Sequence, residues 1–435
     1  MRLIKSVSIS LIAKLAGFLI AIPTSIIIAR YLGPSGRGIF AVLAVITGIA
    51  LQFGNFGFHA SSVYFSAKDK NQIPSIAGVL IIFGLTIGLF ASLGIILISL
   101  LFPKVLLGDI PFLFLVVTLI SLPFAFTALF LQNLLLGMQR IYEYNFIDVA
   151  AKLLTLLMII PLFLVFKKGI FELVIMSTLI AILTGTAFAF FVKKHGSILL
   201  RFDYSLFKRM IRYGSKAYIA ALFAFLVIRS DLILVNYFLG TGSAGLYSLA
   251  VGFTDWLLLV PFTMAAMLFP KATAIGDSKS ELTKKVSRHT VVLVGIACMV
   301  AAIFAKPVVP FVYGKAFTLS ADAFLWLLPG VFFLSLQTIF MHDFAARGMP
   351  PIVYISPAIG FIVNFSLNLI LIPKFGIIAA SMTSSLAYFL MFLITLIYFR
   401  YISDARYSEV LLLNREEIAE FWQTWRDKIL MVRAG

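Results

Sequence analysis

The sequence predicts an all-α membrane protein of about twelve transmembrane helices, built as two tandem six-helix halves. Three observations lead to this fold class. Of the 435 residues, 62% are hydrophobic and 12% are charged, and the mean hydropathy is +1.07. Apolar runs of about twenty residues recur along the chain, and short motifs repeat at nearly one offset. A bilayer suits this composition better than water, because soluble domains are roughly one quarter charged.

The apolar runs each have the length that crosses ~30 Å of hydrocarbon at ~1.5 Å per residue. The first run resembles a secretory signal, but it is long enough to span, and no cleavage site precedes a soluble region, so we expect an uncleaved helix. Short connections predict tight helical hairpins. The twelve runs cover residues 7–29, 38–60, 75–101, 111–136, 146–166, 170–192, 213–238, 244–270, 289–312, 322–345, 352–372 and 376–400.

An internal repeat divides the chain. Residues 31–40 match residues 238–247, and residues 167–170 match residues 374–377, both at an offset of 207. Halves with an even number of helices share one topology and are related by an axis along the membrane normal. We therefore expect an N-terminal lobe over residues 1–200, a C-terminal lobe over 201–402 and a tail over 403–435.

Paired prolines accompany the repeat. Pro123 in the fourth run matches Pro329 in the tenth, and each frees backbone groups and permits bending, which suggests a role in gating. Prolines are also frequent in membrane helices for structural reasons alone. In the tail, Trp422 and Trp425 belong to a helical pattern of apolar residues among charges, which predicts an amphipathic helix on the membrane surface.

The net charge of +17 would indicate a nucleic-acid partner in a soluble protein. In a membrane protein, basic residues in cytoplasmic loops determine topology instead, so we expect no nucleic acid. With the N-terminus inside, the inner segments carry seventeen Lys and Arg residues before the tail and the outer segments eight. This predicts cytoplasmic N- and C-termini in a prokaryotic cytoplasmic membrane.

Enzyme motifs are missing from the sequence. The single cysteine, Cys298, can form no disulfide within the chain, and the four histidines have no metal-ligand spacing. The glycines at 33, 36 and 38 join two membrane helices, so turn chemistry explains them better than nucleotide binding. We expect no catalytic residue, no metal and no cofactor.

Charged residues inside the apolar runs are the most informative feature, since each costs at least ~2.5–3.5 kcal/mol near the bilayer centre. Lys14 lies near mid-depth, and Arg229 lies in the seventh run. Lys152 follows Asp148 by four residues, so it forms either a neutral pair or part of a cavity. We predict that Lys14, Lys152 and Arg229 make a cationic cavity for an anion such as a diphosphate.

The acids in these runs have a second predicted role. Asp148, Asp231 and Asp255 are candidates for coupling transport to H+ or Na+. Arg229 and Asp231 lie on opposite sides of a helix and cannot pair with each other, and Asp255 is the candidate partner of Arg229.

Several stretches resemble the oligosaccharide flippases of O-antigen and polysaccharide biosynthesis, within the multidrug/oligosaccharidyl-lipid/polysaccharide exporter superfamily. The resemblance covers about residues 1–400. It implies a V-shaped bundle like that of multidrug-and-toxin exporters, working by alternating access and ion coupling. Twelve helices argue against the peptidoglycan-precursor branch, whose members usually have fourteen. The stretches are residues 29–38, 229–231, 238–240, 244–248, 268–270 and 372–380.

The implied substrate is a polyprenyl-diphosphate-linked oligosaccharide, moved from the cytoplasmic to the outer leaflet for surface polysaccharide. The implied partners are this lipid-linked oligosaccharide, membrane lipids, a polysaccharide polymerase and glycosyltransferases.

Two alternatives stay open. A cation-coupled multidrug exporter of the same fold would use an acid-rich cavity, and a membrane glycan polymerase or ligase would need a large outer loop, whereas the longest outer connection here has about ten residues.

Overall fold

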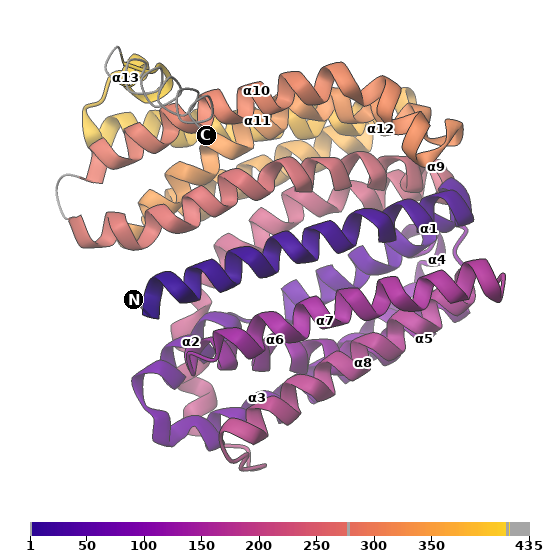
Figure 1. Cartoon of the computed structure of the whole chain (residues 1–435), viewed down its shortest axis with the longest axis vertical. Coiled ribbons are helices and arrows are strands. Elements are labelled where there is room, and N and C mark those ends of the chain that lie inside the picture. The colour runs from indigo at the N-terminus through magenta and orange to yellow at the C-terminus, as the bar shows by residue number, and fades with distance from the viewer. Residues whose placement is uncertain (1, 276–278, 415–416, 418–435) are drawn as a thin grey trace, which may run out of the picture.

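The computed structural model describes residues 2–275, 279–414 and 417, and the regular structure of these residues is entirely helical. Figure 1 shows two bundles side by side, one coloured indigo to magenta and one salmon to yellow. The first bundle holds α1 (Arg2–Gly54), α2 (Phe58–Lys68), α3 (Ile73–Leu101), α4 (Pro103–Leu106), α5 (Phe112–Ile120), α6 (Leu122–Gly137), α7 (Ile141–Ile160) and α8 (Ile170–His195). The second holds most of α9 (Tyr204–Ile275), α10 (Lys279–Tyr313), α11 (Thr318–Ala346), α12 (Ile352–Ser403) and α13 (Tyr407–Leu411).

Among the described residues, nine helical segments are long and apolar enough to cross a membrane. Three of them, in α1, α9 and α12, run for 46, 48 and 52 residues, about twice one crossing. Each of these helices contains one glycine with positive φ, namely Gly33 (67°), Gly240 (77°) and Gly376 (67°). Because ψ lies near ±180° at Gly33 and Gly240, only glycine suits the turn there. Six of the nine segments cross once and three are long enough to cross twice, which gives the predicted twelve crossings.

Three predicted runs differ in detail from the helices. The run 38–60 was predicted as one helix, but α1 ends at Gly54 and the separate helix α2 begins after Gly57, whose φ is 80°. The run 111–136 is interrupted at Ser121, between α5 and α6. The run 146–166 ends in a π-helical turn over Pro161–Val165. Hydrophobicity alone does not predict such breaks, since the residues at each break are surrounded by apolar residues in the sequence.

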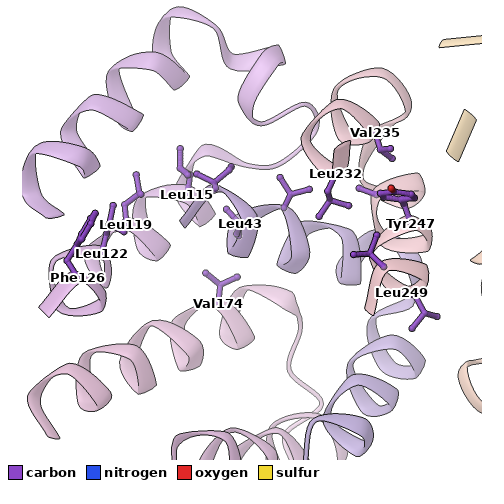
Figure 2. Close-up of a cluster of buried hydrophobic side chains, with 14 of the residues drawn as sticks. Leu43, Leu115, Leu119, Leu122, Phe126, Val174, Leu232, Val235, Tyr247 and Leu249 are labelled. Carbon is purple, nitrogen blue, oxygen red and sulfur yellow. The ribbon is translucent and has the colours of Figure 1, made fainter. Parts of the chain in front are cut away.

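The apolar core crosses from one bundle to the other. Figure 2 shows Leu115 and Leu119 of α5 on one side of Leu43 of α1, and Leu232 and Tyr247 of α9 on the other side. Leu115 and Tyr247 are fully buried. The two lobes are therefore packed together by apolar contacts in this region, and they are not joined by a linker alone.

The repeat has a direct counterpart in three dimensions. A methyl group built on Gly38 would lie 1.8 Å from the carbonyl oxygen of Thr241, and one built on Gly245 would lie 1.8 Å from that of Pro34. The offset of 207 relates Gly38 to Gly245 and Pro34 to Thr241, so the two contacts are equivalent. The two hairpins therefore pack backbone to backbone around an approximate twofold axis. We call this the hairpin end of the molecule.

The start of α9 packs against the first bundle. Phe207 contacts Phe58 of α2 with ring centroids 5.5 Å apart, and a methyl group on Gly214 would lie 2.4 Å from the carbonyl oxygen of Gly57. A single helix thus contacts both lobes. The predicted lobe boundary at residue 200 precedes α9 by a few residues and stays a prediction.

The described part of the tail contacts the second bundle. Arg288 of α10 forms an ion pair of 2.6 Å with Glu417, and Lys284 contacts Glu409 of α13 at 3.2 Å. The predicted amphipathic helix with Trp422 and Trp425 lies outside the described residues.

The cavity between the lobes as candidate functional site

A cavity of about 500 Å³ lies between the two lobes. Its walls come from both spans of α1, from α7 and from both spans of α9. Apolar side chains such as Ile20 and Phe225 form most of the wall, with a few polar and charged groups among them. Such a mixture is usual for ligand sites, where few polar groups fix a ligand inside an apolar pocket. The charged lining residues are Arg37, Lys152, Arg229, Asp231 and Asp255.

The structure brings together four of the six charged residues predicted from the sequence. Lys152, Arg229, Asp231 and Asp255 line the cavity, and Asp148 joins them through Lys152. Lys14 is exposed on α1 and is not part of the lining. It lies one turn before Gly17, where a methyl group would come within 3.1 Å of the Lys152 amine.

The cations of the cavity are partly neutralised by neighbouring acids. Lys152 Nζ lies 2.7 Å from Asp148 Oδ2 one turn away on α7. Arg229 Nη2 donates to both carboxylate oxygens of Asp255, at 2.9 and 3.1 Å, and so joins the two spans of α9. Two of the three predicted cations therefore have a carboxylate partner. The i,i+4 spacing indicated the Lys152–Asp148 pair, and the structure confirms Asp255, the candidate from the sequence, as the partner of Arg229.

Asp231 is almost completely buried and accepts hydrogen bonds from three donors. The donors are the Tyr247 hydroxyl, the Ser384 hydroxyl at 3.1 Å and the backbone N–H of Leu232 at 2.8 Å. Ser384 also accepts from Asn364, which in turn accepts from Asn368. This chain of polar groups, the Asp231 network, links α9 with both spans of α12. Buried polar groups are stable in such surroundings only when hydrogen-bonded.

Arg37 is a lining residue that sequence reasoning missed. Its place in a glycine-rich hairpin made turn chemistry and loop charge the simpler interpretation. In the structure its side chain points back into the cavity, where Nη1 donates to the Ser25 hydroxyl at 3.0 Å. Spacing along the helix could not have shown this, because the direction of the side chain depends on how Gly33 turns the chain.

The paired prolines occupy different positions in their helices. Pro123 lies in the first turn of α6, just after the break at Ser121, and Ser92 of α3 donates to the Leu119 carbonyl four residues before the proline. Pro329 lies inside the continuous helix α11. There the Ser385 hydroxyl accepts from the Gly330 N–H at 3.1 Å and donates to the Trp326 carbonyl at 2.6 Å.

In both lobes a serine from a neighbouring helix therefore satisfies a carbonyl group beside the proline, as expected where water is scarce. A gating role for either proline stays a prediction.

Comparison with known proteins decides the family. The model of the family described as "Polysaccharide biosynthesis protein" matches residues 27–322. The chain belongs to this family. The family match and the fold are those of a multi-pass membrane transporter and not of an enzyme, which argues against the glycan polymerase or ligase.

Two curated archaeal proteins are similar in sequence. One is an uncharacterized membrane protein of Methanocaldococcus jannaschii, 26% identical over 44% of this chain. The other is the probable low-salt glycan biosynthesis flippase Agl15 of Haloferax volcanii, 20% identical over 42% of the chain. Each alignment spans 39% of the relative's own length.

Solved structures share the fold over most of the chain. The lipid II flippase MurJ in its inward closed conformation matches with a TM-score of 0.73 at 15% identity, covering 90% of this chain and 89% of that one. An inward-facing multidrug resistance transporter of the MATE family matches with a TM-score of 0.75 at 13% identity, covering 89% and 94%. The predicted exporter-like bundle is thus confirmed.

Proposed function

We propose that this protein moves a lipid-linked oligosaccharide with an anionic diphosphate from the cytoplasmic to the outer leaflet of a prokaryotic cytoplasmic membrane. The observation that carries the proposal is a cavity between two repeated lobes, lined by cations and closed on one side by tightly packed hairpins. Family membership and the similarity to a glycan biosynthesis flippase support the same substrate class.

The proposed direction depends on the topology. We assign the hairpin end to the outer face, because the loop charges favour cytoplasmic termini. In that orientation the cavity is sealed toward the outside. Alternating access would require the hairpins to separate while the opposite ends of the lobes approach each other.

Ion coupling is part of the proposal. Asp231 is the strongest candidate, since it lines the cavity and its hydrogen bonds connect α9 with α12. A proton or Na+ bound there would change which of these hydrogen bonds form, and would so bias the packing of α9 against α12. Asp255 and Asp148 are weaker candidates because each already holds a cation of the cavity.

The test uses a cell that depends on this protein for surface glycan. We expect Arg229→Gln, alone or with Lys14→Gln, to abolish glycan display while the protein remains in the membrane. Lys152→Gln should reduce display strongly. Lys168→Gln is the matched control, because Lys168 also faces an acid four residues away, Glu172 at 3.9 Å, but lies outside the cavity lining.

The opposite outcome is equally clear. If Lys14→Gln and Arg229→Gln, singly and together, support normal display, the cationic cavity is not the substrate site. The multidrug exporter of the same fold is the second candidate, favoured by the acids Asp231 and Asp255 in the cavity wall. Export of cationic dyes that fails in Asp255→Asn, with glycan display intact, would support it.

A further inference from the structure

The charge balance of the cavity singles out Arg37. Lys152 and Arg229 each contact a carboxylate, and Asp231 is satisfied by three donors. Arg37 is the lining cation for which the described residues provide no ion-pair partner. Its Nη1 binds Ser25, whereas its Nε is buried and makes no hydrogen bond with any described residue. A buried donor of this kind is rare in proteins and calls for an explanation.

A second unused polar group lies beside the first. Tyr313, at the C-terminal end of α10, is buried to 4% exposure next to Arg37 and Ser25. Its hydroxyl lies near that of Ser25, but it makes no hydrogen bond of normal geometry with any described residue. Arg37 belongs to the first lobe and Tyr313 to the second, so the two groups lie close together across the lobe interface.

The interface is held in place independently of these two groups. Arg30 of α1 donates from Nε to the Val312 carbonyl and from Nη2 to the Phe311 carbonyl, both at 2.6 Å. These bonds fix the last turn of α10 against α1, one residue before Tyr313. The positions of Arg37 and Tyr313 are therefore set by the backbone and do not depend on a contact between them.

The chemistry of the groups indicates the ligand. A guanidinium offers several N–H donors in a rigid fork, and the hydroxyls of Tyr313 and Ser25 can both donate. Together they would suit a tetrahedral oxyanion, and they would repel a cation. Phosphate oxygens are the natural acceptors for such a set.

We propose that Arg37, Ser25 and Tyr313 form a phosphate subsite at the hairpin end of the cavity, which receives the diphosphate of the transported lipid. This inference rests on the proposed function for the identity of the substrate. Because its donors come from both lobes, a bound phosphate would link the lobes beside the closed hairpins. Lys152 and Arg229 would then line the path to the subsite rather than form its centre.

In the experiment, the purified full-length protein in detergent is titrated with sodium pyrophosphate at constant ionic strength, and calorimetry measures the binding. The unmodified protein should bind pyrophosphate more tightly than sulfate. Arg37→Gln should weaken binding by about tenfold or more, and Arg37→Lys by less, because lysine keeps the charge but loses the fork. Tyr313→Phe, which keeps the ring, should weaken it about threefold, the loss of one hydrogen bond.

A control outside the cavity lining tests whether the effect is local. Lys168→Gln removes a cation that also faces an acid but lies outside the lining, and it should change pyrophosphate affinity less than twofold, as expected of a distant charge screened by salt. Equal binding by Arg37→Gln and the unmodified protein would overturn the subsite. So would an absence of pyrophosphate binding, or a loss in Lys168→Gln as large as that in Arg37→Gln.

A transport assay distinguishes the subsite from the proposed function. Vesicles containing the protein are loaded with a fluorescent polyprenyl-diphosphate disaccharide, and its exposure on the far leaflet is measured. Binding of pyrophosphate through Arg37 without translocation would refute the proposed function and leave the subsite standing. Translocation that survives in Arg37→Gln would refute the subsite and leave the function standing.

Discussion

The two lobes share a backbone plan but differ in buried chemistry. At the repeat offset, the hairpin glycine Gly33 corresponds to Gly240, and both take nearly the same left-handed conformation. The Asp231 network has no such counterpart. The offset of 207 places Thr24, Leu157, Pro161 and Ser177 where the second lobe has Asp231, Asn364, Asn368 and Ser384.

This difference shows which features the duplicated fold requires. A hairpin between two membrane helices needs a residue that tolerates positive φ, and both halves keep glycine there. A buried carboxylate is needed only where function calls for one, and only one lobe carries it with a full set of donors. The approximate symmetry therefore describes the geometry of the transporter, and the asymmetry identifies the lobe in which we expect ion coupling.

The largest effect should follow from disturbing the shared hairpins. Gly38→Ala and Gly245→Ala each place a methyl group 1.8 Å from a carbonyl oxygen of the opposite hairpin, so backbone must move in both lobes. We expect each variant to unfold at a much lower temperature in detergent, with a loss of several kcal/mol, and to lose glycan display.

Gly94→Ala is the matched control for the hairpin variants. Gly94 lies inside α3 with nothing within 4 Å of the added methyl group. Its replacement should leave stability unchanged or raise it by up to about 1 kcal/mol, since alanine favours helix. Normal stability of Gly38→Ala would contradict the packing of the hairpins.

The next effect should differ between the two lobes. Asp231→Leu removes the acceptor of the Tyr247 and Ser384 hydroxyls, and each unsatisfied buried group costs about 1–3 kcal/mol. Thr24→Val, at the corresponding position, removes only a hydroxyl that donates to its own helix at Ile20. We expect a large fall in thermal stability for the first variant and almost none for the second. Equal losses would mean that the lobes do not differ in this way.

A smaller effect should distinguish the two proline sites. Ser385→Ala removes one hydroxyl that serves both Gly330 and Trp326, whereas Ser92→Ala removes a hydroxyl with the acceptors Leu119 and Gly88. Hydrogen bonds between membrane helices contribute about 0.6 kcal/mol each on average, so losses of that order are expected. Because Ser385, unlike Ser92, also accepts a hydrogen bond from a backbone N–H, Ser385→Ala should lower the free energy of unfolding more than Ser92→Ala.

The smallest effect concerns the tail, whose described residues contact the second lobe. The hydrogen bond from Lys284 lowers the pKa of Glu409 below its ordinary value of 4.5. A lowered pKa means that the charged pair stabilises docking above that value and that this stabilisation is lost as pH falls through the folded pKa.

Hydrogen exchange at residues 404–411, corrected for intrinsic rates, should therefore be slow at pH 7 and faster near pH 4. Glu409→Gln should exchange faster already at pH 7. Exchange that is unaffected by pH and by this substitution would show that the Lys284 contact does not hold the tail.

Sequence reasoning succeeded where the bilayer imposes a local rule. Apolar length predicted the crossings, and the repeat predicted the paired turns at Gly33 and Gly240. It was less successful where side-chain direction decides. Lys14 was predicted to belong to the cavity from its depth alone, yet it lies outside the lining, and Arg37 was assigned to a loop although it points inward.

The sequence by itself determined the solvent, the number of crossings and the tandem halves, because hydrophobic length, loop charge and glycine turns act over a few residues at a time. The tertiary structure showed which polar groups meet. It joins Arg229 to Asp255, which the sequence offered only as a candidate partner, and it joins Asp231 to Ser384 across 153 residues, a contact that the sequence did not indicate. It also decided that Arg37 and Tyr313 lie close together, each with a polar atom that makes no hydrogen bond of normal geometry with the described residues. Electrostatic energy depends on distances in space, and the linear order of residues does not contain them.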